Sequence, residues 1–200
     1  MCSPFSAIVL QSPRDKGGFR LLMSPYTDSH SELITLHGLK DAGRLTFARI
    51  EFTPSDWKTA HLVETYTLRL DEERAPAWWT EETAEAVTEQ MRAHVARCII
   101  TDARPLLLGG KWIIGPGAEV GRADFANIIA MTGGTLSRMD GGTLSQMVGG
   151  TLRRMVGGTL RRMVGGTLSR MVGGTLLEVF GTYSPTICAG ANITTDHRNK

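Results

Sequence analysis

The sequence has few cysteines, few aromatic residues and no long apolar segment. Cysteine occurs only at Cys2, Cys98 and Cys188, an odd number without paired spacing, so neither a disulfide framework nor a zinc site is expected. No apolar run approaches the roughly 20 residues that span a bilayer, and no basic region precedes the short apolar stretch near Met1, which argues against a secretory signal. We therefore expect a cytoplasmic protein without membrane association, metal or cofactor.

Aromatic residues make up only 6% of the chain, whereas glycine accounts for 23 of its 200 residues, above the usual share of about 7%. The hydrophobic share of 42% and the charged share of 21% are typical of a soluble globular protein. Residues 1–104 carry 12 basic and 15 acidic side chains (net −3), and residues 105–200 carry 10 and 5 (net +5). This change in composition predicts two domains, 1–104 and 105–200.

The second domain contains a tandem eight-residue repeat of the form GGTLxxMV. Six clear units start at Gly133, and less regular copies precede them from Gly109 in the same register. A helix is excluded because two glycines in every octad cost about 2 kcal/mol relative to alanine, and because eight residues match neither the heptad nor the eleven-residue period. Each of the first five clear units offers a leucine and a methionine that stacking would bury, and the sixth has Val179 in place of the methionine. The repeat therefore predicts a β-solenoid of octapeptide repeats.

The repeat also predicts how each coil bends. Leucine stands at the fourth position of the unit and methionine at the seventh, and residues three apart on a straight strand point to opposite faces. A straight strand would bury arginine with one of them, which is too costly for an unpaired guanidinium group. We expect the chain to bend so that both apolar residues face inward, with the glycine pair forming another corner. A coil of two octads and a coil of three both remain open, and Trp112 and Phe125 are expected to form the amino-terminal cap.

The first domain has the pattern of a small α+β fold. Strands are expected at Phe5–Leu10, around Phe19–Met23, at Leu45–Phe52 and at His61–Leu70. A short helix should begin after Asp28 or Ser29 and stop at Gly38, and a longer one should run from Thr80 to about Cys98. Two further expectations concern groups of side chains in this domain. Trp57, Trp78 and Trp79 should anchor the core, and the carboxylates Asp71, Glu72 and Glu73 should lie in a solvated loop.

Several segments together resemble a group of phage- and prophage-encoded hypothetical proteins. The segments are CSPFSAIV at the start, DSHSELI followed by HGLKD, RIEFTPSDW, and RLDEERAPAWW ahead of the GGT-type octads. The resemblance covers nearly the whole chain and implies an amino-terminal module fused to an octad β-solenoid. It also implies a phage context, in which a host factor would be the partner. This chain departs from such arrays in using leucine and methionine where they commonly have valine.

Cys2 is the candidate for catalysis. Removal of Met1 before a small residue would leave cysteine at the terminus, where a thiol with its own α-amine as base is the arrangement of amino-terminal nucleophile enzymes. His30 and His37, at the two ends of the expected first helix, are candidate helpers. A structural or incidental cysteine is the alternative, because no oxyanion donor or substrate motif accompanies Cys2.

Arginine side chains in the repeat are the candidates for binding. They are Arg138, Arg153, Arg154, Arg161, Arg162 and Arg170, in a stretch whose only acidic residue is Asp140. Stacked coils would arrange them as a ladder able to contact phosphates of a nucleic acid or another polyanion. The alternative is a solvated surface that prevents aggregation. We expect a non-enzymatic binding or scaffolding protein, with a protein partner or a second copy of this chain on the solenoid.

Overall fold

The structure is a computed structural model that describes residues 5–12, 15, 18–40, 46–180, 186–187 and 190–197. The chain divides into two compact units. The first consists of Met1–Ser55 and Val63–Ala96, and the second of Asp56–Leu62 and Arg97–Lys200. This division differs from the expected one in two respects, because the second unit begins before 105 and takes in a short segment from the first half of the sequence.

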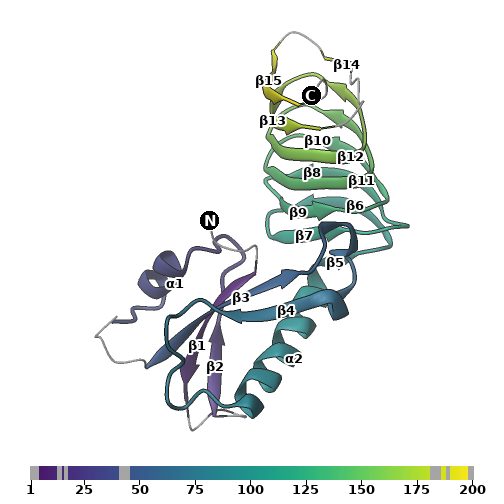
Figure 1. The fold of residues 1–200 in the computed structure, drawn as a ribbon. Coiled ribbons are helices and arrows are strands. Elements are labelled where there is room, and N and C mark those ends of the chain that lie inside the picture. Colours follow the sequence, from purple (N-terminus) through teal and green to yellow (C-terminus); the bar gives the residue numbers. More distant parts are fainter. Residues whose placement is uncertain are drawn as a thin grey trace. The chain divides into compact units, whose positions relative to one another are not determined.

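The first unit is a small antiparallel sheet with helices. Its strands are ordered β2-β1-β3-β4 (Figure 1). Its elements are β1 (Ser6–Gln11), β2 (Phe19–Leu22), α1 (His30–Leu36), β3 (Phe47–Pro54), η2 (Val63–Thr65), β4 (Tyr66–Leu70) and the greater part of α2 (Glu81–Cys98). Ser29 caps α1 by accepting a hydrogen bond from the Glu32 N–H, as its position before an apolar run predicts.

The two helices lie on opposite faces of the sheet. On one face Leu33 of α1 packs with Ile8 and Phe47. On the other face Phe5 contacts His94 of α2 edge to face, with ring centroids 6.2 Å apart, and it contacts Tyr66 in the same way. The sheet therefore has apolar residues on both sides, and side chains such as Phe52 are completely buried.

The three tryptophans do not form this core, contrary to expectation. Trp57, Trp78 and Trp79 are all only half-buried. Trp57 begins the short helix η1 (Trp57–Thr59), which belongs to the second unit. Phe5, directly before β1, and Phe47 and Phe52 of β3 are buried instead, because alternation along a strand directs its side chains onto the two covered faces of the sheet.

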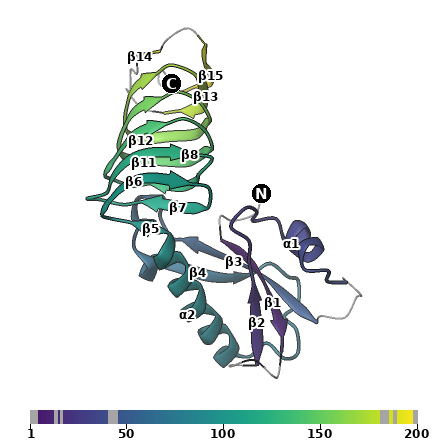
Figure 2. The same cartoon turned by 180° about the vertical axis from the view of Figure 1, so that it is seen from behind.

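The second unit is a parallel β-solenoid, shown from two sides in Figures 1 and 2. Its strands are β5 (Ile99–Ile100), β6 (Ala103–Leu108), β7 (Lys111–Ile114), β8 (Glu119–Asp124), β9 (Asn127–Met131), β10 (Thr135–Met139), β11 (Thr143–Met155), β12 (Thr159–Met171), β13 (Gly174–Val179), β14 (Thr186–Ile187) and β15 (Ala191–Asp196). The fold class expected from the sequence, a small sheet-and-helix domain followed by a β-solenoid, is confirmed.

The pairing register gives the length of one coil. Thr135 pairs with Thr151, and Thr143 pairs with Thr159, so each residue lies beside one sixteen positions on. One coil therefore has the length of two of the eight-residue units. β11 and β12 each pass through both sides of the solenoid. One side, which we name the β8 face, contains β6, β8, β10, the second halves of β11 and β12, and β14. The opposite side, the β9 face, contains β5, β7, β9, the first halves of β11 and β12, β13 and β15.

Leucine and methionine both face inward, as the repeat predicts. In the unit Thr135–Met139, Leu136 and Met139 are fully buried, whereas Ser137 and Arg138 between them are partly or wholly exposed. The same pattern recurs through the later coils, where Leu152, Leu160 and Met155 are also fully buried. The interior is thus a set of stacked leucine and methionine columns, and the chain bends between them so that no arginine is buried.

The glycine pairs allow the coils to stack closely. Gly150 has φ +76°, a left-handed conformation that favours glycine. A Cβ atom at Gly149 would stand only 2.3 Å from the Thr132 carbonyl oxygen of the preceding coil. The second glycine of a pair is therefore needed for its backbone conformation, and the first for its clearance from the neighbouring coil.

The expected amino-terminal cap is only partly correct. Trp112 is half-buried against the solenoid core, and its indole N–H donates to the Gly109 carbonyl oxygen. Phe125, however, is 78% exposed and has φ +53°, so its side chain covers no core. The solenoid instead begins earlier, at β5, directly after α2. The loss of the octad pattern after Gly181 also predicts a carboxy-terminal cap; Tyr183 and Pro185 of that segment lie outside the described residues, whereas Asn192 lies in β15.

The segment Asp56–Leu62 belongs to the solenoid unit, and its residue His61 contacts the first coils of that unit. The Thr132 hydroxyl lies 2.9 Å from Nδ1 of His61, and the Cβ atom of His61 would be only 3.2 Å from a Cβ atom at Gly115. The strand expected over His61–Leu70 is accordingly shorter than expected and begins at Tyr66.

Candidate functional site: the arginine-bearing faces of the solenoid

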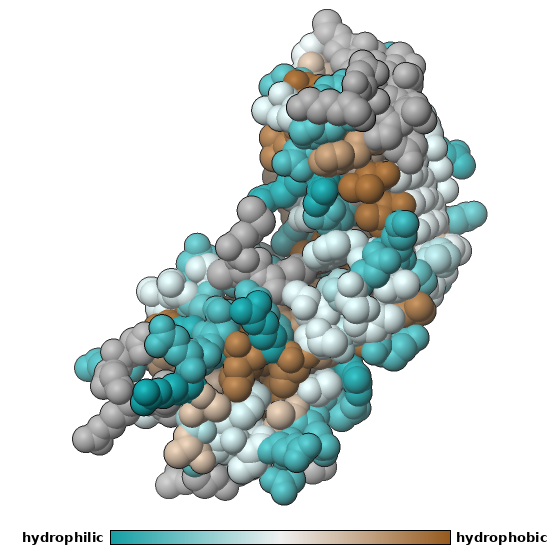
Figure 3. Space-filling view, in the orientation of Figure 1, coloured by the Kyte–Doolittle hydropathy of each residue, from teal (hydrophilic) through white to brown (hydrophobic). Residues whose placement is uncertain are grey.

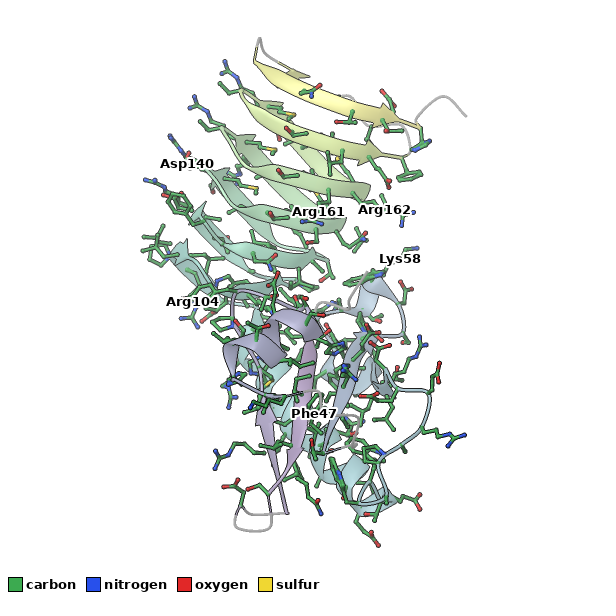
Figure 4. The ribbon with its side chains drawn as sticks, turned by 90° about the vertical axis from the view of Figure 1, so that its left-hand side faces the viewer. Phe47, Lys58, Arg104, Asp140, Arg161 and Arg162 are labelled. Carbon is green, nitrogen blue, oxygen red and sulfur yellow. The ribbon has the colours of Figure 1, made fainter. Side chains whose placement is uncertain are left out.

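All six candidate arginines are exposed, but they lie on two different faces. The β8 face carries Arg138, Arg153, Arg154 and Arg170, and the β9 face carries Arg161 and Arg162. Figure 4 shows Asp140, the acid beside Arg138, on one side of the solenoid and Arg162 on the other. The single ladder suggested by the sequence is thus two separate groups, because successive octads fall on opposite sides of a sixteen-residue coil.

The β8 face contains a continuous column of four arginines. Arg122 pairs with Arg138, Arg138 with Arg154, and Arg154 with Arg170 in successive coils. We name this column the arginine ladder. Neighbouring members belong to strands about 4.8 Å apart, well within the Debye length of about 8 Å at physiological ionic strength. Arg122 was not among the arginines predicted from the repeat, although it occupies the sixth position of a less regular unit starting at Gly117.

The lower half of the ladder, by which we mean Arg122 and Arg138 in the earlier coils, is neutralised by acidic side chains. Asp140 is 13% exposed and lies between two ladder arginines, with its Oδ2 2.7 Å from Nε of Arg122 and its Oδ1 paired with Arg138. Asp124 adds a second carboxylate, 2.8 Å from Arg122. These two arginines are therefore already engaged with carboxylates of this chain.

The upper half of the ladder lacks such acids. The position that holds Asp124 and Asp140 in the lower coils holds Val156 and Val172 above them. Among the described residues, no carboxylate pairs with Arg154, Arg170 or the adjacent Arg153. These three guanidinium groups form an exposed cationic patch, which we name the upper arginine patch. Figure 3 colours one side of the molecule by hydropathy, and on the side of the solenoid that it shows, hydrophilic side chains surround a few hydrophobic ones.

The β9 face is different, because Arg162 already has two partners. Its Nε lies 3.8 Å from Glu178, and its guanidinium stands over the ring of Phe180 at 4.8 Å. Phe180 in turn stacks on His197, with ring centroids 4.6 Å apart. Only Arg161 on this face has no charged partner among the described residues, so a single free cation is present here instead of a patch.

The residues proposed for catalysis do not form a site that the structure describes. Cys2 lies outside the described residues. His30 is 5% exposed, its Nε2 lies 3.0 Å from the Ile50 carbonyl oxygen, and its Nδ1 lies 3.1 Å from Asp71. His37 is exposed at the other end of α1. Since both ring nitrogens of His30 face oxygen acceptors, this side chain joins α1 to the sheet.

The sequence suggested a solvated loop for the acidic triplet after β4, but two of its three carboxylates have partners. Asp71 pairs with His30, and Glu72 is only 9% exposed beside Arg49. The Arg49 guanidinium donates two hydrogen bonds to Glu72, at 2.9 and 3.1 Å, and the backbone N–H of Arg49 donates a third. These carboxylates hold the end of β4 to β3 and α1. Sequence could not reveal this because the partners are 23 or more residues away.

The described residues contain no group of three or more histidine, cysteine or acidic side chains placed to hold a metal. Cys98, at the end of α2, is buried and forms no disulfide among the described residues. Burial raises the pKa of its thiol, while the positive charges of Lys111 and Arg97 oppose this shift more weakly. In the part of the chain that the structure covers, no helix has the length and apolar character needed to cross a membrane.

Three exposed apolar side chains lie together on the first coils of the solenoid. Leu106 and Leu108 of β6 are 44% and 64% exposed. Leu108 pairs with Asp124, and Phe125 follows directly with 78% exposure. We name this group the β6 apolar patch. The repeat gave no signal for it, because these coils precede the regular units.

Comparison of the chain with protein-family models, with curated proteins and with solved structures finds no match. The functional interpretation therefore depends on the chain's own geometry.

Proposed function

We propose that this chain is a non-enzymatic binding protein whose solenoid binds an anionic macromolecule through the upper arginine patch. The observation that carries the proposal is that Val156 and Val172 stand where the lower coils have aspartates. Arg154 and Arg170, with Arg153 beside them, are therefore exposed without a carboxylate partner among the described residues. Like charges in neighbouring strands repel one another, and an anionic partner would relieve this repulsion. The partner is a protein or a nucleic acid that presents several negative charges.

The phage context and the cytoplasmic location are further parts of this proposal. Their support is the resemblance of the sequence to phage-encoded proteins and the scarcity of cysteine. In that context the anionic partner would be a host factor.

The test compares two double variants that remove the same charge from opposite faces. Arg154→Gln with Arg170→Gln removes two members of the patch, and Arg161→Gln with Arg162→Gln is the control on the β9 face. Binding of the full chain to a fluorescent 20-base-pair DNA and to a labelled polyglutamate peptide is measured by anisotropy over a salt series. The better-bound probe identifies the chemical class of the partner.

For DNA, we expect the logarithm of the binding constant to fall with the logarithm of salt concentration. Each phosphate contact contributes a slope of about −0.9, so the β8-face variant should reduce the slope by about 2. The control should leave it nearly unchanged. Equal losses in both double variants, or wild-type binding to both probes that ignores salt, would contradict the proposal.

A second candidate function is self-assembly of the solenoid, which the β6 apolar patch favours. Exposed apolar side chains that cluster at an edge strand are typical of interaction surfaces. The test is light scattering of the wild type and of the double variant Leu108→Ser with Phe125→Asn, where asparagine tolerates the positive φ of that position. Val164→Ser, which removes an exposed valine from a later coil, is the control. A monomeric wild type at high concentration would exclude self-assembly.

A further inference from the structure

The strand β4 is an edge strand with backbone groups directed away from the sheet. Among the described strands, in the order β2-β1-β3-β4, it has β3 as its only neighbour. The bonds from Ser55 N to Thr65 O and from Asp71 N to Arg49 O identify the residues of this strand that face β3. In an antiparallel ladder such residues alternate with residues whose N–H and C=O point outward. Leu68 is one of the outward-directed residues.

A groove of about 710 Å³ lies along this edge, between β4 and α2. One wall is Tyr66–Leu68, and the other is a single face of α2 that includes the small side chains of Ala84 and Thr88. Both ribbon views show β4 beside α2 (Figures 1 and 2). The volume is within the range of sites that enclose a ligand. An edge strand that opens on a groove beside a helix is a setting in which an extended peptide adds to a sheet.

The charge on the helical wall indicates the chemistry of such a peptide. Glu81, Glu85 and Glu89 line the groove at intervals of four residues. Arg92 neutralises Glu89, at 2.7 Å, but among the described residues no cation pairs with Glu81 or Glu85. Residues four apart on a helix have Cβ atoms about 5–6 Å apart. Alternate residues of a strand are about 6.6 Å apart, so two cationic side chains at alternate positions match these two carboxylates.

Arg92 also lines the groove. Its Nε is buried and has no hydrogen-bond partner among the described residues, whereas its Nη1 donates to Glu89. A buried donor without an acceptor is costly. This nitrogen is closed to solvent and is therefore no contact for an incoming strand, but the side chain as a whole is 38% exposed where it lines the groove.

We propose that the groove between β4 and α2 binds an extended basic peptide segment, which adds a fifth strand to the sheet and sets lysine or arginine at alternate positions against Glu81 and Glu85. The outward N–H and C=O of Leu68 form the ladder with the peptide, and the carboxylates select its charge. This site lies in the first unit and does not depend on the arginines of the solenoid.

The binding experiment uses the full chain and a fluorescein-labelled nonapeptide of alternating lysine and threonine. A control peptide has the same sequence with every second backbone nitrogen methylated, so it keeps the charge and loses ladder donors. Anisotropy should show saturable binding of the first peptide and at least tenfold weaker binding of the second. Equal binding of the two peptides, or no binding of the first at 1 mM, overturns the proposal.

Two pairs of variants locate the peptide on the chain. Glu85→Gln should weaken binding about threefold, as expected for one exposed ion pair, whereas Glu82→Gln, on the same helix but outside the groove lining, should not. Leu68→Pro removes only an outward N–H and should bind about fivefold more weakly than Leu68→Ala, which keeps it. Equal effects within either pair of correctly folded variants contradict the proposal.

Hydrogen exchange gives a readout that needs no variant. The Leu68 amide of the wild-type chain should exchange more slowly with the peptide bound, because it gains a ladder hydrogen bond. Unchanged exchange at saturating peptide overturns the proposal even if Leu68→Pro fails to fold. It is also overturned if the peptide does not bind and Glu85→Gln instead abolishes self-association in light scattering, since the helix would then contact a second copy.

Discussion

The glycine pairs of the solenoid allow a test that separates two physical effects. Gly109 has φ +54° and no atom within 4 Å of the position that a Cβ atom would take, so Gly109→Ala imposes only the cost of a left-handed alanine. Gly165 has an ordinary φ, but a Cβ atom there would stand 2.2 Å from the Val148 carbonyl oxygen. Gly158 combines both, with φ +80° and a Cβ only 2.6 Å from the Gly142 oxygen.

These geometries give an expected order of destabilisation. A left-handed alanine costs about 1–2 kcal/mol, and overpacking against a neighbouring backbone costs about 1–3 kcal/mol. Gly109→Ala should therefore lower the free energy of unfolding by about 1–2 kcal/mol, and Gly158→Ala by about 2–5 kcal/mol. For a unit of roughly 100 residues, each kcal/mol lowers Tm by about 4–8 °C.

The measurement is thermal and urea unfolding followed by far-ultraviolet circular dichroism, with the solenoid transition compared among the three variants. Gly165→Ala isolates the clearance between coils, because its backbone conformation suits alanine. The reasoning is refuted if Gly165→Ala is as stable as the wild type, or if Gly109→Ala and Gly158→Ala destabilise the solenoid equally.

Three further predictions concern single side chains. The raised pKa of the Cys98 thiol leaves less thiolate near neutral pH, so iodoacetamide should modify it much more slowly in the native chain than in urea, as measured by peptide mass spectrometry; similar rates would contradict its burial. Because the folded state holds the Cys98 proton more tightly than the unfolded state, the raised pKa adds to the free energy of unfolding below pH 9.0, the ordinary pKa of the thiol. This added stability is lost as the pH rises from 9.0 through the raised pKa. Leu152→Ala should cost about 2–5 kcal/mol of unfolding free energy because it opens a cavity in the fully buried leucine column, whereas Leu106→Ala, at a 44% exposed position, should cost far less in the same urea titration. His30→Ala should destabilise the first unit by about 1–3 kcal/mol, since the Ile50 carbonyl and Asp71 lose a buried partner, and unaltered stability would show that these contacts contribute nothing.

Local pattern was sufficient to predict much of the fold. The glycine pairs exclude a helix, and the leucine and methionine positions require a bend that buries both without burying arginine. α1 and α2 follow from the cap residues Ser29 and Thr80 and from apolar spacing. Such features were predictable because backbone conformation and side-chain period act over a few neighbouring residues.

The residues that share a face were not predictable in the same way. The coil could take two octads or three, and only the sixteen-residue register places Arg122, Arg138, Arg154 and Arg170 in one column. The same register places Asp140 beside Arg122 and Arg138. Arg154 and Arg170 are then left without an acidic neighbour among the described residues.

The sequence by itself determined the repeat, the inward-facing residues and the approximate elements of the first domain. Only the tertiary structure decided the partners of His30, Arg49 and His61, the edge position of β4 and the groove beside it. The physical reason is distance along the chain. A side chain's immediate neighbours restrict its backbone conformation, but its charge partner or packing contact can come from any segment that the fold brings within a few ångströms, and no local pattern specifies that segment.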